Sequence, residues 1–274
     1  MRVTKPRHWC GRIREVRNVT RGPAFFTLPR TVPFSRKTIT GWIAGLFALL
    51  AVLIPTNTCF AQQIVPPVGE PILKQFVYEE WKIWTSPASV RRSDATWIGG
   101  LAVSTAILIK TDRNVSWEIA ETDDWIKPSH TVSLFGSGIP MFAAPAGIFA
   151  IGKLTHNSDL SKTGTLGLMA VGHAGVVSQV AKQVAGRERP MTGAGLGQFR
   201  KGGSSFPSGH AMTSWALATV VARRSNNRWV KLGSYSFAAS VGLSRVGGRN
   251  HFPSDVLVGS VSGYLIGRYV TRDK

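Results

Sequence analysis

Histidine, aspartate and arginine gather in the stretch Ser244–Asp255, SRVGGRNHFPSD, between two apolar segments of the chain. Pro253 suits the first position of a helix, so Asp255 lies in the first turn, four residues after His251. A carboxylate there can bond one imidazole nitrogen, fix the tautomer and leave the other nitrogen as a nucleophile or base. Arg245, at the end of the preceding segment, adds a permanent positive charge. The alternative is a helix-start aspartate next to an ordinary loop histidine.

A second polar cluster, FPSGHAM, begins another apolar segment at residues 206–212. Ser208 suits an N-cap, and Gly209 allows a ligand to approach the backbone closely. The unpaired N–H groups of a helix start, together with the helix dipole, form an anion site. His210 lies in this first turn, where the positive helix end lowers the pKa of an imidazole. The alternative is a capped helix that happens to contain a histidine.

A third cluster, KQVAGRERP, closes an apolar segment at residues 182–190. Gly186 and Pro190 predict that the helix ends between them. Lys182 then points out of the helix end, and Arg189 returns from the following loop. Taken alone, such cations are common near helix C-termini, where they complement the dipole.

Two histidines and an aspartate could also ligate a zinc ion. However, three cationic side chains, Lys182, Arg189 and Arg245, would surround that ion and repel it. The same cations suit an anion such as phosphate, for which arginine offers paired hydrogen bonds. We therefore predict an anion site that holds neither metal nor cofactor.

In chain order, the patterns Lys-x6-Arg-Pro, Pro-Ser-Gly-His and Ser-Arg-x5-His-x3-Asp resemble the three-part signature of the phosphatidic-acid-phosphatase type 2 and vanadium haloperoxidase superfamily. Every signature position is filled, and the resemblance extends over about residues 94–272. It implies a helical bundle with the active site at one end and a phosphatase that requires no metal. Vanadate would enter only as an inhibitor, or as the cofactor in the haloperoxidase alternative.

The resemblance also implies a role for each matching residue. His251 would attack phosphorus and form a phosphohistidine, and Asp255 would orient the ring of His251. His210 would protonate the leaving oxygen and then help to activate water. Preorganised cations and N–H donors stabilise the charge of a transferring phosphoryl group. The residues that would hold the phosphate oxygens are Lys182, Arg189, Ser208, Gly209 and Arg245.

Other polar residues fall outside the signature. Arg187, Glu188 and Arg249 lie in its variable gaps. For Arg249 two roles stay open, contact with a second phosphate or head group and exposure in a solvated loop. His173, within an apolar segment, is predicted to be a packed polar residue rather than a catalyst.

The rest of the chain predicts an all-α fold, a six-helix bundle preceded by an amphipathic helix over residues 72–86. Asp94, Ser208 and Ser254 are candidate N-caps. Small residues throughout permit the close helix packing found in bilayers, which favours a membrane-associated bundle over a soluble one. Only the second and third segments are clearly long enough to span a bilayer. The six apolar segments are residues 94–110, 130–153, 162–185, 208–224, 230–246 and 254–270.

The chain divides into three predicted regions. Residues 1–61 form a basic leader with a signal peptide or signal anchor, because Arg36 and Lys37 precede a short apolar run. Residues 62–93 form a Pro-rich linker and the amphipathic helix, and residues 94–272 form the catalytic domain. Cleavage after Ala61 is expected, and no structural disulfide is expected from the two cysteines.

The net charge and the signal-like segment limit the classes of substrate and the cellular location that we predict. The net charge of +19 suits anionic lipid or a phosphorylated substrate, and no pattern of nucleic-acid binding accompanies it. We predict a metal-independent phosphatase for a lipid phosphate monoester or diphosphate, exported to the inner membrane with its site facing the periplasm or exterior. The alternatives are a soluble periplasmic acid phosphatase of broad specificity, a haloperoxidase, and a non-catalytic membrane protein that binds anionic lipid.

Overall fold

The computed structural model describes residues 71–86, 91–120, 126–192 and 195–272. The predicted leader and signal segment, both cysteines and nearly all of the Pro-rich linker lie outside these residues. The predictions for them therefore stay predictions.

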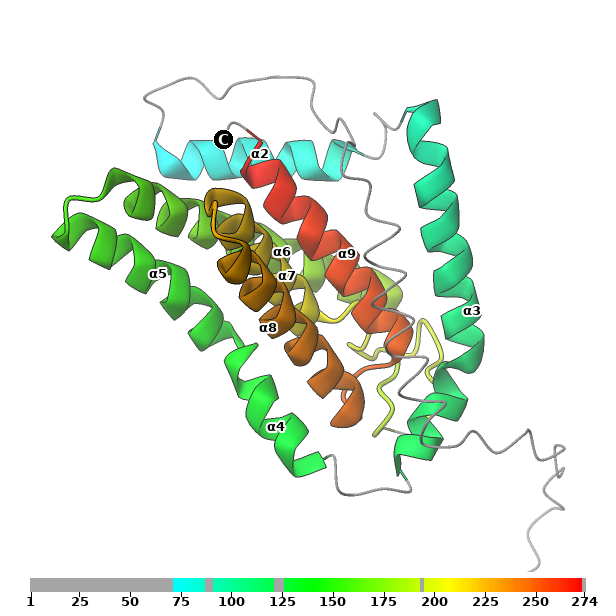
Figure 1. The fold of residues 1–274 in the computed structure, drawn as a ribbon. Helices are drawn as coiled ribbons and strands as arrows, with labels where there is room; N and C mark the ends of the chain where they lie inside the picture. Colours follow the sequence, from blue (N-terminus) through cyan, green and yellow to red (C-terminus); the bar gives the residue numbers. More distant parts are fainter. Residues whose placement is uncertain (1–70, 87–90, 121–125, 193–194, 273–274) are drawn as a thin grey trace, which may run out of the picture.

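The described residues contain eight α-helices and no strand, which confirms the all-α fold (Figure 1). The amphipathic helix, α2, and the last three apolar segments appear close to their expected places. A short 3-10 turn, η2 (Arg92–Asp94), leads into α3. The helices are α2 (Ile72–Thr85), α3 (Ala95–Ala120), α4 (Ile126–Phe135), α5 (Gly138–Leu154), α6 (Ser158–Ala185), α7 (Gly209–Arg224), α8 (Arg228–Gly247) and α9 (Pro253–Val270).

Helix α7 is largely buried, and α6, α8 and α9 pack around it. Gly259, Gly263 and Gly267 form a stripe at every fourth residue of α9. A Cβ at any of the three would clash with α7 or with the residue that caps it, Ser208. The stripe therefore sets α9 directly against α7. This contact fixes the site, because it brings the start of α9 beside the start of α7: Ser208 N–H donates to the carbonyl of Asp255 at 3.0 Å.

The predicted second segment, residues 130–153, is two helices rather than one. Helices α4 and α5 meet at an angle of 45°. The break lies at Gly136 and Ser137, where a Cβ on Gly136 would collide with Val241 of α8 and approach His210 of α7. The hydroxyl of Ser137 bonds the carbonyl of Leu134 at 2.6 Å. A close tertiary approach thus bends a chain segment whose composition indicates one helix.

The first segment is also longer than predicted, since α3 continues from residue 110 to Ala120 and includes Asp112. Of the three candidate caps, Ser208 is confirmed: its hydroxyl accepts from Ala211 N–H at 3.5 Å. Ser254 was wrong, because α9 begins at Pro253 and the Ser254 hydroxyl bonds Asp112 instead.

The third candidate cap, Asp94, directly precedes α3. Its carboxylate accepts from the backbone N–H of Arg91 at 3.1 Å and from the indole N–H of Trp97 at 3.4 Å. Asp94 therefore stabilises the η2 turn, which leads directly into α3.

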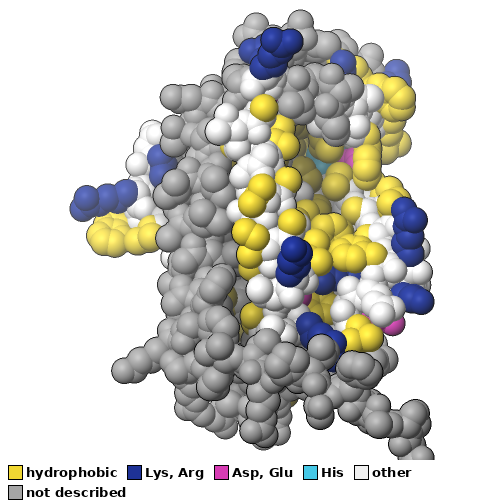
Figure 2. All heavy atoms as spheres, turned by 90° about the vertical axis from the view of Figure 1, so that its right-hand side faces the viewer, with side chains coloured by type: hydrophobic (Ala, Val, Ile, Leu, Met, Phe, Trp, Pro, Cys, Tyr) yellow, Lys and Arg dark blue, Asp and Glu magenta, His cyan; other side chains and the backbone are white. Residues whose placement is uncertain are grey.

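Among the described helices, α6 is long and apolar enough to cross a membrane, and the bent α4–α5 pair passes the same test if it is counted as one span. These are the two segments that the sequence singled out. On the α3 side of the molecule, hydrophobic side chains of the described residues are interspersed with polar groups, and lysines and arginines stand at separate places (Figure 2).

Candidate functional site

The three signature clusters meet at one end of the bundle. Lys182 closes α6, Arg245 closes α8, His210 opens α7 and Asp255 opens α9. Helix α6 ends as predicted at Gly186, whose left-handed backbone (φ 51°) turns the chain back toward the bundle. Antiparallel packing of α6 on α7, and of α8 on α9, explains why residues so distant in the sequence gather here.

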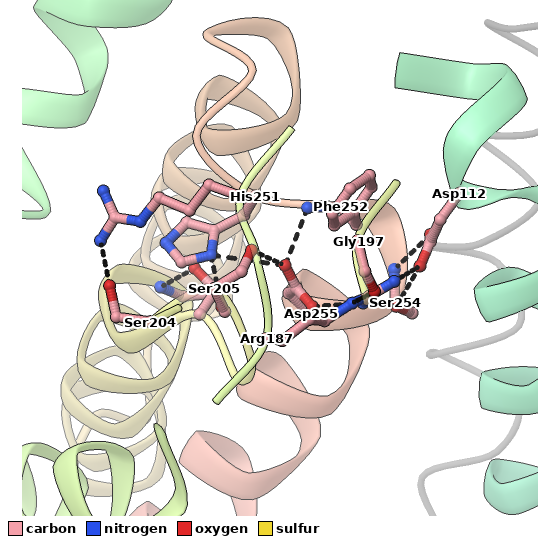
Figure 3. A network of polar contacts seen from close by, with 12 residues as sticks. Asp112, Arg187, Gly197, Ser204, Ser205, His251, Phe252, Ser254 and Asp255 are labelled. Carbon is pink, nitrogen blue, oxygen red and sulfur yellow. Dashed lines mark hydrogen bonds and ion pairs between the residues drawn. The ribbon is translucent and has the colours of Figure 1, made fainter. Parts of the chain in front are cut away.

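His251 precedes α9 and is only 1% exposed. Its Nδ1 lies 2.6 Å from the backbone carbonyl of Ser205 and 3.6 Å from Oδ2 of Asp255 (Figure 3). A carbonyl oxygen only accepts, so Nδ1 carries the proton and Nε2 has a free lone pair. Among the described residues no group bonds Nε2. The tautomer is therefore set first by Ser205, which the sequence did not indicate, and Asp255 is the more distant partner.

The carboxylate of Asp255 is completely buried and held at both oxygens. Oδ1 accepts from the guanidinium of Arg187 at 2.6 Å. Oδ2 accepts from the hydroxyl of Ser205 at 2.5 Å and from the N–H of Phe252 at 2.9 Å. Burial alone would raise the pKa of Asp255, but the neighbouring imidazole of His251 and the charge of Arg187 outweigh it and hold the pKa below its usual value. Asp255 is thus an ionised, fixed partner for the imidazole.

His210 occupies the first turn of α7, facing the cations of the site. Burial, followed by the charges of Arg245 and its neighbours, lowers the pKa of His210 to about 3. The direction agrees with the sequence-based expectation, although burial and cations are the main causes. His210 is therefore neutral at physiological pH. A bound phosphate would place negative charge beside it and raise its pKa toward the range of a general acid.

The cations of the site have spare donors. Arg189 bonds the hydroxyl of Ser204 at 3.1 Å, and Arg245 bonds that of Ser133. The Nε atoms of both arginines are buried and have no hydrogen-bond partner among the described residues. Burial, and then the charge of Arg189, lowers the pKa of Arg245 to about 10, so it stays protonated at neutral pH. Buried positive charge with unused N–H groups fits an anionic ligand.

Lys182 and Gly209 show how closely the parts of this site are packed. A Cβ on Gly209 would lie 3.3 Å from Nζ of Lys182 and 2.8 Å from Oγ of Ser178. Glycine therefore leaves the room that the lysine and a ligand need. Ser178 lies one turn before Lys182 on α6, and its buried hydroxyl has no hydrogen-bond partner in the part of the chain that the structure describes. No sequence signal indicated Ser178, because it lies within an apolar helix and outside the three motifs.

Arg187, which the sequence left without a role, is the most deeply buried cation near the site. It is 2% exposed, bonds Asp255 and lies against the rings of Phe252 and Phe199. On its other side it bonds Asp112 of α3 at 2.8 Å. In the sequence Asp112 is flanked by other charged residues and looked like the polar end of a helix, so no local signal connected it to the site.

The remaining polar residues lie apart from this network. Arg249 has a left-handed backbone (φ 54°), and its Nε is buried with no hydrogen-bond partner from the described segments. His173 is a packed polar residue as predicted, bonded to Glu79 and Glu80 of α2. Among the described residues, no group of histidine, cysteine, aspartate and glutamate side chains could hold a metal ion.

The C-terminal part of the chain, which contains this site, is similar to known phosphatases. The model of the PAP2 superfamily matches residues 164–274, which include every predicted site residue but not Asp112. Lipid A 1-phosphatase from Porphyromonas gingivalis is 36% identical over 77 residues, 26% of this chain and 17% of that protein. Human glucose-6-phosphatase 3 is 38% identical over 81 residues, 25% of this chain and 23% of that protein. The chain thus spans about a fifth of the length of these curated relatives.

Two solved structures are similar in outline. The structure of Aquifex aeolicus LpxE has a TM-score of 0.47 and 20% identity, and the match covers 60% of this chain and 93% of that one. The structure of a transmembrane PAP2-type phosphatidylglycerolphosphate phosphatase from Bacillus subtilis has a TM-score of 0.48 and 22% identity, covering 64% and 94%.

Proposed function

Because the model of the PAP2 superfamily matches residues 164–274, we propose that the chain is a metal-independent phosphatase that acts through a phosphohistidine on a lipid phosphate monoester or diphosphate. The observation that supports this most strongly is the state of His251. One nitrogen of its ring donates to a backbone carbonyl, and the other is free and lies at the end of the bundle where three cations gather. Burial lowers the pKa of His251, which keeps the free nitrogen unprotonated and nucleophilic near neutral pH.

The proposed reaction has two steps. Nε2 of His251 attacks phosphorus, and the bond from phosphorus to the leaving oxygen breaks as that oxygen takes a proton from His210. Water then attacks the phosphohistidine while His210 removes a proton from it, so that the P–N bond breaks and phosphate leaves. Lys182, Arg189 and Arg245 would hold the equatorial oxygens, with N–H groups at the start of α7.

We propose a lipid substrate because of the surface around the bundle. Helix α6 and the α4–α5 pair are candidate spans, and the similarity to a lipid A 1-phosphatase supports a lipid phosphate. Exposed apolar side chains of this size suit a lipid environment better than water. Those at least half exposed on α3, α5, α6 and α8 include Val103, Ile107, Ile139, Ile151, Leu154, Val184 and Leu232.

Export to the inner membrane, with the site facing the periplasm or exterior, is part of the same proposal. It rests on the sequence of residues 36–61, where two basic residues precede an apolar run. The similarity to glucose-6-phosphatase 3 favours a second candidate, a phosphatase for a soluble phosphate monoester.

Phosphate release from full-length protein in detergent tests the proposal. Lipid A and phosphatidate in mixed micelles would be compared with a soluble aryl phosphate, with and without EDTA. We expect faster release from a lipid, no effect of EDTA, and a phosphoenzyme that is labile in acid and stable in base. Loss of activity on chelation would contradict the metal-independent mechanism, and equal release from all substrates would favour the broad-specificity phosphatase.

A further inference from the structure

A continuous network links α3 to the proposed nucleophile (Figure 3). Oδ2 of Asp112 accepts from Nη2 of Arg187 at 2.8 Å, and Nη1 of Arg187 donates to Oδ1 of Asp255 at 2.6 Å. The other oxygen of Asp255 accepts from Ser205, whose carbonyl accepts from His251. Each of the two carboxylates is therefore one step from the same guanidinium, and Asp112 lies outside the range that the family model matches.

Arg187 differs from the three cations proposed to bind phosphate. Its Nε donates to the carbonyl of Gly197 at 3.0 Å, and Nη1 also donates to the hydroxyl of Ser254 at 2.7 Å. The rings of Phe252 and Phe199 lie 4.3 and 4.8 Å from its central carbon. The guanidinium is thus enclosed and bonded on several sides to protein groups. It is not available to a ligand, and its chemistry is directed at the two carboxylates.

Ser254 fixes the geometry between the two ends of this network. Its hydroxyl bonds Asp112, and its backbone N–H donates to Oδ1 of Asp112 at 3.1 Å. Because Ser254 is the residue before Asp255 in the first turn of α9, Asp112 holds the start of α9 directly as well as through Arg187. Burying two carboxylates and a guanidinium is a poor way to gain stability, since desolvation offsets much of the attraction.

The charges of the network suit the proposed reaction. Burial raises the pKa of Asp112, and the hydrogen bond from Ser254 and the charge of Arg187 oppose that rise. When both carboxylates are ionised, Asp112, Arg187 and Asp255 together carry one net negative charge. When Nε2 of His251 bonds to phosphorus while Nδ1 stays protonated, the imidazole ring gains positive charge. A net negative group held beside the ring stabilises that charge, and it does so best in a buried site.

We propose that Asp112 is a positioning residue for the phosphatase reaction: through Arg187 and Ser254 it fixes Asp255 and the ring of His251 and supplies the net negative charge behind them. This proposal rests on the proposed function. It assigns a role in the active site to α3.

The test is the kinetics of Asp112→Asn in the full-length protein, with Asp159→Asn as the matched control. Asp159 is 89% exposed and pairs with Arg224 on the surface, so its substitution removes the same charge far from the site. For Asp112→Asn we expect a loss in kcat of roughly 10- to 100-fold, as for other hydrogen-bonded partners one step behind a reacting group, with little change in KM. The acid limb of the kcat/KM profile should move to lower pH, because loss of negative charge lowers the pKa of His251.

Two further variants complete the test. Asp112→Glu retains the charge and should recover part of the lost kcat and the original acid limb. Ser254→Ala retains the charge but cuts two hydrogen bonds, so kcat should fall without a shift of the acid limb. The proposal is overturned if Asp112→Asn has the same kcat and the same acid limb as Asp159→Asn. It is also overturned if Ser254→Ala has the kcat of the unmodified protein, or if kcat falls in Asp112→Asn with no shift of the acid limb and no recovery by glutamate. Full activity in His251→Ala would instead overturn the proposed function itself.

Discussion

Among the described residues, His251 and His173 are both buried beside carboxylates, and they differ in how their ring nitrogens are bonded. His251 is bonded at Nδ1 only, to a carbonyl, with Asp255 farther away. His173, in the middle of α6, is bonded at both nitrogens: Nδ1 lies 2.5 Å from Glu80 and Nε2 lies 3.3 Å from Glu79. Their exposed fractions, 1% and 0%, are the same within a percent.

The difference shows that a histidine next to a carboxylate is not enough to define a catalytic centre. The ring of His173 is also stacked on Phe76, with centroids 4.1 Å apart, and Arg272 bonds Glu79 from the other side at 3.3 Å. Every polar edge of this imidazole is used to hold α2 against α6. His251 instead keeps one nitrogen free, next to cations whose donors are not all used. The free nitrogen and the uncompensated positive charge are what make a nucleophile for phosphate.

The largest expected effect is that of His251→Ala on turnover. Removal of the attacking nitrogen should lower kcat by roughly 10⁴-fold or more, as for other enzymes that lose their nucleophile. The measurement is initial-rate phosphate release, together with the amount of acid-labile phosphoenzyme. His173→Ala is the matched control, since it removes an equally buried histidine. Comparable losses of kcat in folded samples of both variants would contradict the comparison between the two histidines.

The second effect is that of His210→Gln, which removes the proposed acid but retains a hydrogen-bonding side chain. We expect kcat to fall roughly 10²- to 10⁴-fold, the usual contribution of a positioned general acid. The loss should be smaller for a substrate with an acidic leaving group, such as a nitrophenyl phosphate, because that oxygen leaves without a proton. The same loss for both kinds of leaving group would argue against His210 as the acid.

Much of the site could be predicted from the sequence because its residues lie in short patterns with fixed spacing. The structure gathers Lys182, Arg189, His210 and Arg245 at one end of the bundle with the His251–Asp255 pair, as expected. The roles assigned to them stay predictions. The helices, too, follow from segments of suitable length and composition.

The residues that sequence reasoning missed act across the fold. Asp112 and Arg187 interact only because α3 packs beside α9. No local sequence pattern predicts that contact. Ser205 bonds His251 through its backbone carbonyl, which any residue type would supply, and its hydroxyl bonds Asp255. The bend at Gly136 depends on Val241, a residue of another helix. Local spacing therefore predicts which side chains do chemistry, whereas the groups that orient them depend on tertiary packing.

A third effect concerns stability at acid pH. The pKa of His210 falls from 6.5 in the unfolded chain to about 3 in the folded protein, and the pKa of His251 is also lowered. The unfolded state therefore binds protons more readily between these values. The stability gained from keeping the imidazoles neutral is complete above about pH 6.5 and is lost as the pH falls toward 3. The lowered pKa of Asp255 adds a loss at still lower pH.

The melting temperature of the full-length protein should therefore decline steadily below about pH 6.5. In His210→Gln the decline should be shallower, because one of the two imidazoles with a lowered pKa is gone. Exposed His130 provides the control variant, His130→Gln, which should follow the unmodified protein. A decline of equal slope in all three would indicate that other groups dominate acid unfolding.

The smallest effect on turnover is expected for His173→Gln. Glutamine is shorter and cannot reach both Glu79 and Glu80 or stack on Phe76, so one buried carboxylate loses a partner. A buried polar group left without its hydrogen bond costs roughly 1–3 kcal/mol. That cost should appear locally as faster amide hydrogen exchange in α2, with α7 and α9 unchanged and kcat within about twofold of the unmodified protein. Both ring nitrogens of His173 bond α2, so its expected role is to hold α2 in place. A large fall in kcat with unchanged exchange in α2 would contradict this and would mean that His173 serves the reaction.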